Sequence, residues 1–443
     1  MTSINENSST PEQTVSAPAQ KIHVRVLREK SLNELHKLAV ENNLHNISRV
    51  SKQELIFALM KHFSKQGDEL HAFGILEIMS EQNVGYGFLR CESGSYLAGA
   101  ADIYVSPRQI KSLKLKSGDS ISCTIRMPKG DERYFAVKQI NEVNLEKPGV
   151  NAQKISFSDL RAQFPTRWMK LERGNGSTED VTAKILDMFS PLGFGQRMMI
   201  PAPPKAGKTV LLQQLADSIS HNHPDAHLIV LLIDERPEEV TEMERTVKGS
   251  VIAATFDEPP ARHIQVAEIT IAKAKRLAEH GKDVVILLDS ITRLARAYNT
   301  VTPASGKILT GGVDANALQK PKRFFGAARD TVGGGSISII ATALIDTGSK
   351  MDEVIYEEFK GTGNSEVHLD REIAQKRIFP AIDIERSGTR RDDKLVPTDH
   401  LSSSWALRRY LQTMDKGSGI EFLIERLRTI KTVNEFFKAM KSR

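Results

Sequence analysis

Cysteine is scarce in this chain of 443 residues, which contains only Cys91 and Cys123. These two residues form neither a C-x-x-C motif nor a disulfide framework, so we expect a reducing, cytoplasmic location. Long hydrophobic runs are missing as well: the longest spans residues 228–233, whereas a membrane helix needs about twenty apolar residues. No apolar signal core follows the charges near the N-terminus, and we therefore expect neither secretion nor a membrane-spanning helix.

Aromatic residues are few, at 6% of the chain, and the net charge of +6 is modest. With 40% hydrophobic and 26% charged residues, the composition is that of a globular protein. The charge is unevenly spread, because residues 21–65 hold nine Lys/Arg and four Asp/Glu. This local excess hints at a polyanionic partner, although a solvated surface explains it as well.

The N-terminal part of the chain has two distinct compositions. Residues 1–24 are rich in Ser, Thr, Asn, Pro and Gln, and we expect disorder there. Residues 25–70 predict a small helical domain, because two S-x-x-E capping boxes each open an amphipathic run. The boxes pair Ser31 with Glu34 and Ser51 with Glu54.

A change in hydrophobic period separates the next segments. Residues 71–145 alternate with a period of two, and short runs divided by Gly, Ser and Pro predict a small five-stranded barrel. Residues 146–165 form the expected linker. In residues 166–443, strands and helices alternate, which predicts an α/β domain with a central parallel sheet. The apolar runs 228–233, 284–288 and 337–343 are its expected buried strands.

Residues 202–209 read APPKAGKT and match the phosphate-binding pattern G-x-x-x-x-G-K-T except at Ala202. A short strand precedes them and a helical run follows, so the loop leads into a helix N-terminus, where an anion is favoured. Gly207 lets the backbone approach phosphate, Lys208 reaches the β- and γ-phosphate oxygens, and Thr209 offers a hydroxyl to Mg²⁺. The pattern predicts a nucleotide site that takes ATP and Mg²⁺.

Two of the expected strands end in carboxylates, where ligands lie in open α/β sheets. We predict that Asp289, after strand 284–288, holds Mg²⁺ together with Thr209. Strand 228–233 ends at Asp234-Glu235-Arg236, and Glu235 is our candidate general base. The alternative interpretation of this segment is a surface turn before a proline. Arg236 would contact phosphate or brace Glu235.

Downstream, Arg390 and Arg391 follow a glycine turn and supply permanently charged planar donors that suit a developing γ-phosphate charge. Periodicity does not decide whether these arginines act in their own subunit or in a neighbouring one.

Residues 85–91 read GYGFLRC and predict a nucleic-acid face on the barrel. In a strand, Tyr86, Phe88 and Arg90 share one face, and Leu89 shares the other face with the following cysteine. Leu and Cys suit the core, which leaves two aromatic rings and an arginine outward, with glycines that give bases room. We expect a stacking platform for single-stranded nucleic acid. Core packing of the rings is the alternative. Tyr104 and Tyr134 are candidates to extend the platform.

Together these motifs resemble the Rho family of bacterial transcription termination factors, over residues 25–430. The resemblance implies a cold-shock-like OB-fold barrel capped by the helical domain, and a RecA-type P-loop ATPase that works as a homohexamer. It implies an RNA-dependent ATPase and helicase that binds C-rich single-stranded RNA, translocates on it, and releases transcripts from RNA polymerase, with elongation factors as further partners.

The resemblance also assigns site residues. ATP contacts would come from the loop, a preceding segment, and three later residues: Lys205, Ala206, Gly207, Lys208, Thr209 and Val210; Gly193, Phe194, Gly195, Gln196, Arg197 and Met198; Arg236, Arg377 and Phe379. Phe379 would pack against adenine, while Arg377 and Arg390 would reach the neighbouring subunit's nucleotide. RNA contacts would come from the barrel and from two pore loops: Gly85, Tyr86, Gly87, Phe88, Leu89, Arg90, Asp102, Ile103, Tyr104, Glu132, Arg133, Tyr134, Lys307 and Lys350.

Two other classes of protein remain as alternatives. A rotary or secretion ATPase would share the RecA-type core and the trans arginine, but it would lack the aromatic strand in the barrel. A non-catalytic RNA-binding module would leave Glu235 and Asp289 without a role.

Overall fold

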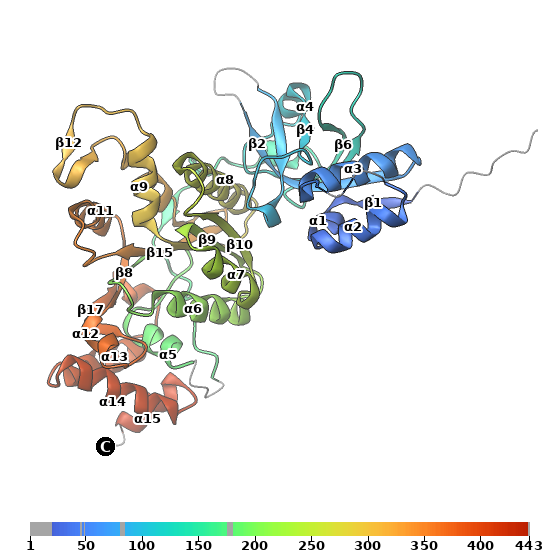
Figure 1. The fold of residues 1–443 in the computed structure, drawn as a ribbon. Helices are drawn as coiled ribbons and strands as arrows, with labels where there is room; N and C mark the ends of the chain where they lie inside the picture. The colour runs from blue at the N-terminus through green and yellow to red at the C-terminus, as the bar shows by residue number, and fades with distance from the viewer. Residues whose placement is uncertain (1–19, 45–46, 48, 80–84, 175–179, 442–443) are drawn as a thin grey trace, which may run out of the picture.

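The computed structural model describes residues 20–44, 47, 49–79, 85–174 and 180–441 (Figure 1). Most of the predicted disordered segment, residues 1–24, lies outside the described residues. Its last part corrects the prediction, because strand β1 (Lys21–His23) pairs in parallel with β2 (Glu69–Ile78). Ladder hydrogen bonds to β2 order these residues, a contact that composition does not encode.

The helical domain consists of α1 (Val24–Glu29), α2 (Leu32–Glu41) and α3 (Lys52–Lys65). Both predicted capping boxes are confirmed. The Ser31 and Ser51 hydroxyls each accept a hydrogen bond from the backbone N–H three residues on, and the Glu34 and Glu54 carboxylates accept one from the backbone N–H of the capping serine. Among the described helices, none has both the length and the hydropathy to cross a membrane.

The predicted barrel is confirmed as a closed sheet of β2, β3 (Gly87–Arg90), β4 (Ile103–Val105), β6 (Phe135–Val143) and β5 (Ser120–Arg126). Antiparallel pairing of β2 with both β3 and β5 closes it. A short helix, α4 (Pro107–Ser112), follows β4. One continuous core joins the barrel to the helical domain, since Leu35 and Leu59 pack in the same cluster as Leu76 and Phe135.

The predicted parallel sheet is confirmed in the α/β domain, with strand order β10-β9-β11-β15-β8-β16-β17. Its strands are β8 (Arg197–Ala202), β9 (His227–Glu235), β10 (Ser250–Thr255), β11 (Val284–Asp289), β15 (Ser336–Leu344), β16 (Ser365–Leu369) and β17 (Ile382–Thr389). Pairing is parallel from β10 to β16, and β17 runs antiparallel to β16.

Helices cover both faces of this sheet (Figure 1). They are α5 (Asp180–Phe189), α6 (Lys208–Asn222), α7 (Pro237–Thr246), α8 (Pro260–Glu279), α9 (Ile291–Val301), α10 (Gln319–Phe325), α11 (Lys350–Lys360), α12 (Arg371–Gln375), α13 (Thr398–Leu411), α14 (Lys416–Arg428) and α15 (Val433–Lys441). Short strands complete the domain: β7 (Ala162–Gln163), β12 (Ile308–Leu309), β13 (Val313–Asp314) and β14 (Arg329–Thr331).

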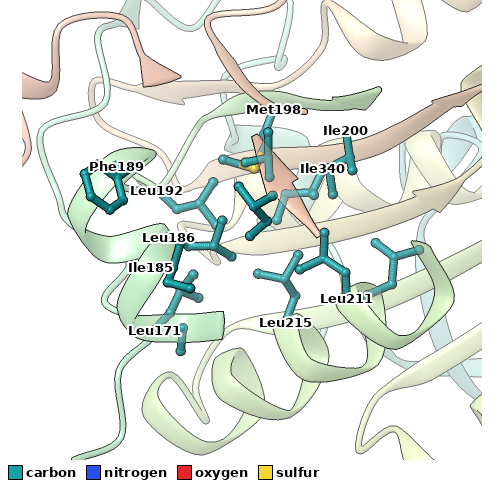
Figure 2. Packing of buried hydrophobic residues seen from close by; sticks show 14 of the residues in the cluster. Leu171, Ile185, Leu186, Phe189, Leu192, Met198, Ile200, Leu211, Leu215 and Ile340 are labelled. Atoms are coloured by element: carbon teal, nitrogen blue, oxygen red, sulfur yellow. The ribbon is translucent and has the colours of Figure 1, made fainter. Parts of the chain in front are cut away.

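Two apolar clusters hold these layers together. Figure 2 shows the first, in which side chains of α5 and α6 pack against β8 and β15. The second lies under α8 and α9 and includes Tyr96, which the loop between β3 and β4 inserts into it. Strand β7, part of the predicted linker, pairs with β14 and so belongs to the large sheet. The barrel is therefore anchored to the ATPase domain by apolar packing as well as by the chain.

Candidate nucleotide and nucleic-acid sites

The phosphate loop joins β8 to α6, as predicted. Lys205 and Gly207 have positive φ angles of 64° and 88°, which curl the loop at the start of α6. Gly207 is the N-cap residue and has no side chain that could cap the helix. The first-turn N–H groups of α6 are therefore oriented toward the loop, where an anion is favoured. The Val210 side chain points away from the core and is 55% exposed.

Lys208 lies between the two carboxylates that the sequence selected. Its Nζ is 2.9 Å from Glu235 Oε1 and 2.8 Å from Asp289 Oδ1. The Thr342 hydroxyl donates to Asp289 Oδ1 at 2.7 Å. Burial alone would lower the pKa of Lys208, but Asp289 and Glu235 together raise it. The ends of β9 and β11 thus bring three predicted residues into one cluster: the phosphate anchor Lys208, the base Glu235 and the metal ligand Asp289.

Glu235 itself is 2% exposed. Burial and the neighbouring Asp289 carboxylate raise its pKa, against the opposing effect of Lys208. A raised pKa brings a carboxylate closer to the range in which it can exchange a proton with water. This environment differs from that of a surface turn.

Arg293 is a member of the cluster that sequence reasoning missed. Its guanidinium donates to Asp234 Oδ2 at 2.7 Å, and its Nε is 3.5 Å from Glu235 Oε1. Arg293 lies in the first turn of α9, the helix that Ser290 caps directly after Asp289. An arginine four residues after Asp289 was the sequence feature that could have predicted its place in the cluster. Arg236 is exposed at the N-cap of α7. The cations that contact Glu235 are instead Lys208 and Arg293.

Phe379 lies beside the phosphate loop. A Cβ on Gly207 would be 3.4 Å from its ring, and the ring is 44% exposed. An exposed aromatic ring next to the loop offers a flat surface for a base. Arg377, also exposed, has a positive φ of 61°.

One predicted group of ATP contacts lies at the amino end of β8, whereas the phosphate loop follows its carboxyl end. The group comprises Gly193, Phe194, Gly195, Gln196, Arg197 and Met198. Strand β8 separates it from the loop by about 17 Å, at about 3.3 Å per residue. Met198 is fully buried, and Gln196 is bonded to Asn364 at 2.7 Å. The structure therefore does not bring these residues to the loop of their own chain, and it assigns Gln196 and Met198 internal contacts in place of the expected ATP contact.

Arg390 lies at the same end of the sheet as the start of β8. It follows β17, its backbone N–H donates to Asn364 O at 2.9 Å, and its side chain is exposed. Its charge helps to lower the pKa of Arg197, after burial and Arg329. Arg391 instead forms an ion pair with Asp393 at 2.9 Å. Within one chain, Arg390 and the phosphate loop lie at different ends of β8.

The residues around Lys208 fit a magnesium ion. Mg²⁺ prefers oxygen ligands and is usually held by one or two protein groups plus phosphate oxygens and water. Thr209 in the first turn of α6 and Asp289 at the end of β11 offer such oxygens. The described residues hold no group of three His, Cys, Asp or Glu that could bind a metal alone, so a bound nucleotide would complete the site.

Four aromatic rings meet on the barrel. Tyr86 stacks on Tyr104 at 5.9 Å between ring centroids, and Phe88 contacts Tyr104 at 6.1 Å and Tyr134 at 4.8 Å. Tyr86 is 43% exposed, and the other rings are half-buried. Tyr86 directly precedes β3 and Phe88 lies in it, Tyr104 is in β4, and Tyr134 directly precedes β6. The barrel thus assembles the predicted platform from three separate segments. We call these four residues the aromatic platform.

Arg90 shares the face of β3 that carries Phe88, as the strand alternation predicted, but it is not exposed. It is buried, ion-paired with Asp102 and with Glu77 at 2.6 Å, and its guanidinium lies 5.1 Å from the centre of the Phe88 ring. Packing from outside the barrel buries Arg90, because its β2 partner Ile75 belongs to an apolar cluster of the ATPase domain and Glu77 accepts from Gln265 of α8 at 2.8 Å. Arg90 and Asp102 thus form a charged base beneath the aromatic platform.

The remaining barrel residues have mixed positions. Leu89 and Ile103 are buried in the core. Gly87 serves packing rather than base access, because a Cβ there would lie 2.6 Å from Leu76. Glu132 pairs with Arg126 at 2.6 Å. Gly85 precedes β3, and Arg133 is exposed before β6.

The two predicted pore loops lie against each other. Lys307 is exposed beside the hairpin of β12 and β13, and Lys350 is exposed at the start of α11. A Cβ on Gly311 would be 2.8 Å from the Lys350 carbonyl group. Two cationic side chains therefore extend from one pair of touching loops.

Comparison with known proteins agrees with this arrangement. Residues 26–68 match the N-terminal domain of Rho termination factor, residues 72–149 match its RNA-binding domain, and residues 182–389 match the nucleotide-binding domain of the ATP synthase alpha/beta family. Transcription termination factor Rho of Pseudomonas fluorescens is 60% identical over 94% of this chain and 98% of the relative. The chain belongs to the Rho family. The Rho of Escherichia coli K12 is 59% identical over the same shares, and that of Haemophilus influenzae is 60% identical over 95% of this chain and 100% of the relative.

Solved structures agree on the ATPase fold. A prototypical ATPase from a bacterial type III secretion system has a TM-score of 0.54 and 23% identity, over 63% of this chain and 86% of that chain. The assembled ATPase EscN of enteropathogenic E. coli has a TM-score of 0.52, again at 23% identity, over 63% and 72%. These similarities concern the fold that the Rho family shares with secretion ATPases.

Gly195 offers a test of its structural role. Its φ is +93°, and a Cβ would lie 2.2 Å from the Asp330 backbone nitrogen. We expect Gly195→Ala to lower the thermal unfolding midpoint clearly more than Gly281→Ala does. Gly281 has a φ of +76° but nothing within 4 Å, so its substitution costs only backbone strain of about 1–3 kcal/mol. Equal midpoints for the two variants would contradict the steric explanation.

Proposed function

We propose that this chain is an RNA-dependent ATPase and helicase that works as a homohexameric ring. It binds C-rich single-stranded nascent RNA, translocates along it, and terminates transcription by releasing the RNA from RNA polymerase, with elongation factors as partners. The observation that carries the proposal is that one chain combines the Lys208–Glu235–Asp289 cluster with an exposed aromatic platform on a separate barrel.

Hydrolysis follows from the charges around Lys208. Without nucleotide, its ammonium is neutralised by Glu235 and Asp289. Nucleotide phosphates compete for the same ammonium, which frees the Glu235 carboxylate to orient and deprotonate a water molecule. Mg²⁺ held by Thr209 and Asp289 supplies the neutralising charge for the phosphates when it is bound.

The far side of the γ-phosphate needs a further cation. The position of Arg390 at the amino end of β8 supports action on the nucleotide of the neighbouring subunit, and we assign Arg377 to the same interface. A trans arginine couples hydrolysis to ring geometry, and Lys307 and Lys350 would transmit the resulting movement to RNA.

RNA is held first on the barrel. Aromatic rings stack on bases of any sequence, so the aromatic platform favours single strands over duplexes. Arg90 and Asp102 beneath the rings offer a donor and an acceptor to a base edge. The preference for C is inferred from family membership. A secretion-type ATPase shares the fold of the ATPase domain, but the aromatic platform has no role in that function.

The first prediction concerns hydrolysis. Lys208→Ala and Glu235→Ala should each lower RNA-stimulated ATP turnover by about a hundredfold or more, because one loses the phosphate anchor and the other the base. Steady-state phosphate release, with and without C-rich RNA, measures this. Glu238→Ala, at an exposed position in α7, is the matched control. Wild-type turnover in Glu235→Ala would move the base elsewhere, with Asp234 as the next candidate.

The second prediction concerns RNA. Phe88→Ala and Tyr86→Ala should weaken binding of a short C-rich RNA, since each stacked ring contributes roughly 1–3 kcal/mol, while ATP binding is retained. Tyr410→Ala serves as control, because Tyr410 is also exposed, at 50% against 43% for Tyr86, but lies on α13. Fluorescence anisotropy measures both affinities. Equal affinity for duplex and single-stranded RNA would refute the assignment.

The third prediction concerns the ring. Arg390→Ala should lower turnover by a factor of about 10³, whereas Arg391→Ala, whose side chain is paired with Asp393, should not. Mixing inactive Arg390→Ala chains with inactive Lys208→Ala chains should restore partial activity, because some interfaces then combine an intact loop with an intact arginine. Mixed rings that regain no turnover would argue against the trans assignment.

A further inference from the structure

A cationic groove of about 280 Å³ lies between the barrel and the ATPase domain. Lys275 and Arg276 of α8 and Lys320 and Arg323 of α10 line it, and Tyr298 and Phe324, both nearly buried, lie among its apolar lining. We refer to this surface as the cationic groove. Its one acidic lining residue is Glu268.

The positive charge of the cationic groove is only partly neutralised. Glu268 accepts from the Tyr298 hydroxyl at 3.0 Å and lies 3.3 Å from Lys320 Nζ, and Arg276 pairs with Glu279 at 2.6 Å. Lys275 and Arg323 form no ion pair with any residue that the structure describes. Two cations therefore face the groove without a carboxylate partner.

The surroundings of Lys275 disfavour the charged form of its side chain. Burial, together with Arg276 and Arg329, lowers its pKa, and Glu279 compensates only in part. A chain does not gain stability by gathering uncompensated cations around a hollow. A bound anion would relieve this repulsion.

One rim of the cationic groove adjoins the aromatic platform. Ser117, which lines the groove, accepts through its hydroxyl from the Ile78 backbone N–H at 3.1 Å. Ile78 pairs with Gly87, directly between Tyr86 and Phe88. The groove therefore begins one strand away from the platform.

The other rim is formed by the two helices that flank the first predicted pore loop in the chain. Tyr298 is in α9 and Lys320 is in α10, so the two residues flank the segment that carries Lys307 and the β12–β13 hairpin. Figure 1 shows α8 between the barrel and α9, with the hairpin beyond α9. The groove thus lies between the two surfaces to which RNA binding is assigned.

We propose that the cationic groove binds the phosphate backbone of single-stranded RNA as it passes from the aromatic platform to the pore loops. The inference rests on the proposed RNA-binding function. Single-stranded RNA is the occupant that fits, because a phosphodiester chain is the one anion that both flanking surfaces would hold at the same time. Stacking on Tyr298 and Phe324 is excluded by their burial, so recognition here is electrostatic and independent of sequence.

The test compares two RNAs. A short C-rich oligonucleotide fills the aromatic platform alone, and a long unstructured RNA also crosses the cationic groove. For the full-length Lys275→Ala/Arg323→Ala double variant, the slope of log K against log salt for the long RNA should be shallower by about 1.4, since each single-strand phosphate contact contributes about 0.7. The affinity for the short oligonucleotide should match wild type.

Controls separate charge from fold. Lys275→Arg/Arg323→Lys keeps both charges and should restore the wild-type slope. Lys438→Ala/Arg428→Ala removes one lysine and one arginine from exposed positions on α15 and α14 and should leave the slope unchanged. Arg323→Ala alone provides a milder variant, with half of the effect, if the double variant unfolds at a lower temperature.

Three outcomes would overturn the inference. An unchanged slope for the long RNA shows that the groove does not contact phosphate. An equal loss for long and short RNA shows that the substitutions damage the platform. A loss of ATP affinity with normal RNA slopes identifies a nucleotide as the anion. Failure of the proposed function looks different, because wild-type protein would then bind neither RNA in preference to duplex.

Discussion

Parallel hydrogen bonding between β9, β11, β15 and β8 aligns the carboxyl ends of these strands at one edge of the sheet. The phosphate loop, Glu235 and Asp289 all follow such ends, so the cluster around Lys208 is a direct consequence of strand direction. Glu235 and Asp289 are both nearly buried there, and Lys208 lies between them. Lys208 offsets the repulsion between the two carboxylates, which would otherwise make burial of both unfavourable.

The same sheet separates groups that we assign to one reaction. Arg390 and the Gly193–Met198 segment lie at the amino end of β8, and the phosphate loop lies at its carboxyl end. A rigid strand cannot bring these groups together inside one chain. A site built from both ends would need another subunit to complete it, which gives the proposed ring a physical reason.

In the barrel, contacts between side chains hold the aromatic rings of the platform at the surface. Phe88 makes edge-to-face contacts with Tyr104 and Tyr134 that hold the rings in place, and Arg90, paired with Glu77 and Asp102, supports Phe88 from below. Glu77 also accepts from Gln265 of α8 at 2.8 Å. The support of the platform therefore reaches into the ATPase domain.

Local patterns in the sequence determined the capping boxes, the order of strands and helices, the phosphate loop and the carboxylates Glu235 and Asp289, because each depends on residues adjacent in the chain. Tertiary structure alone decided the rest. Arg293 contacts Glu235 because α9 places it beside the cluster, whereas Arg236, at the N-cap of α7, is exposed. Arg90 is buried because the ATPase domain covers its end of the barrel face, and β1 is ordered because it pairs with β2. Period and spacing encode which face a residue takes within its own element, but not what another element places against that face.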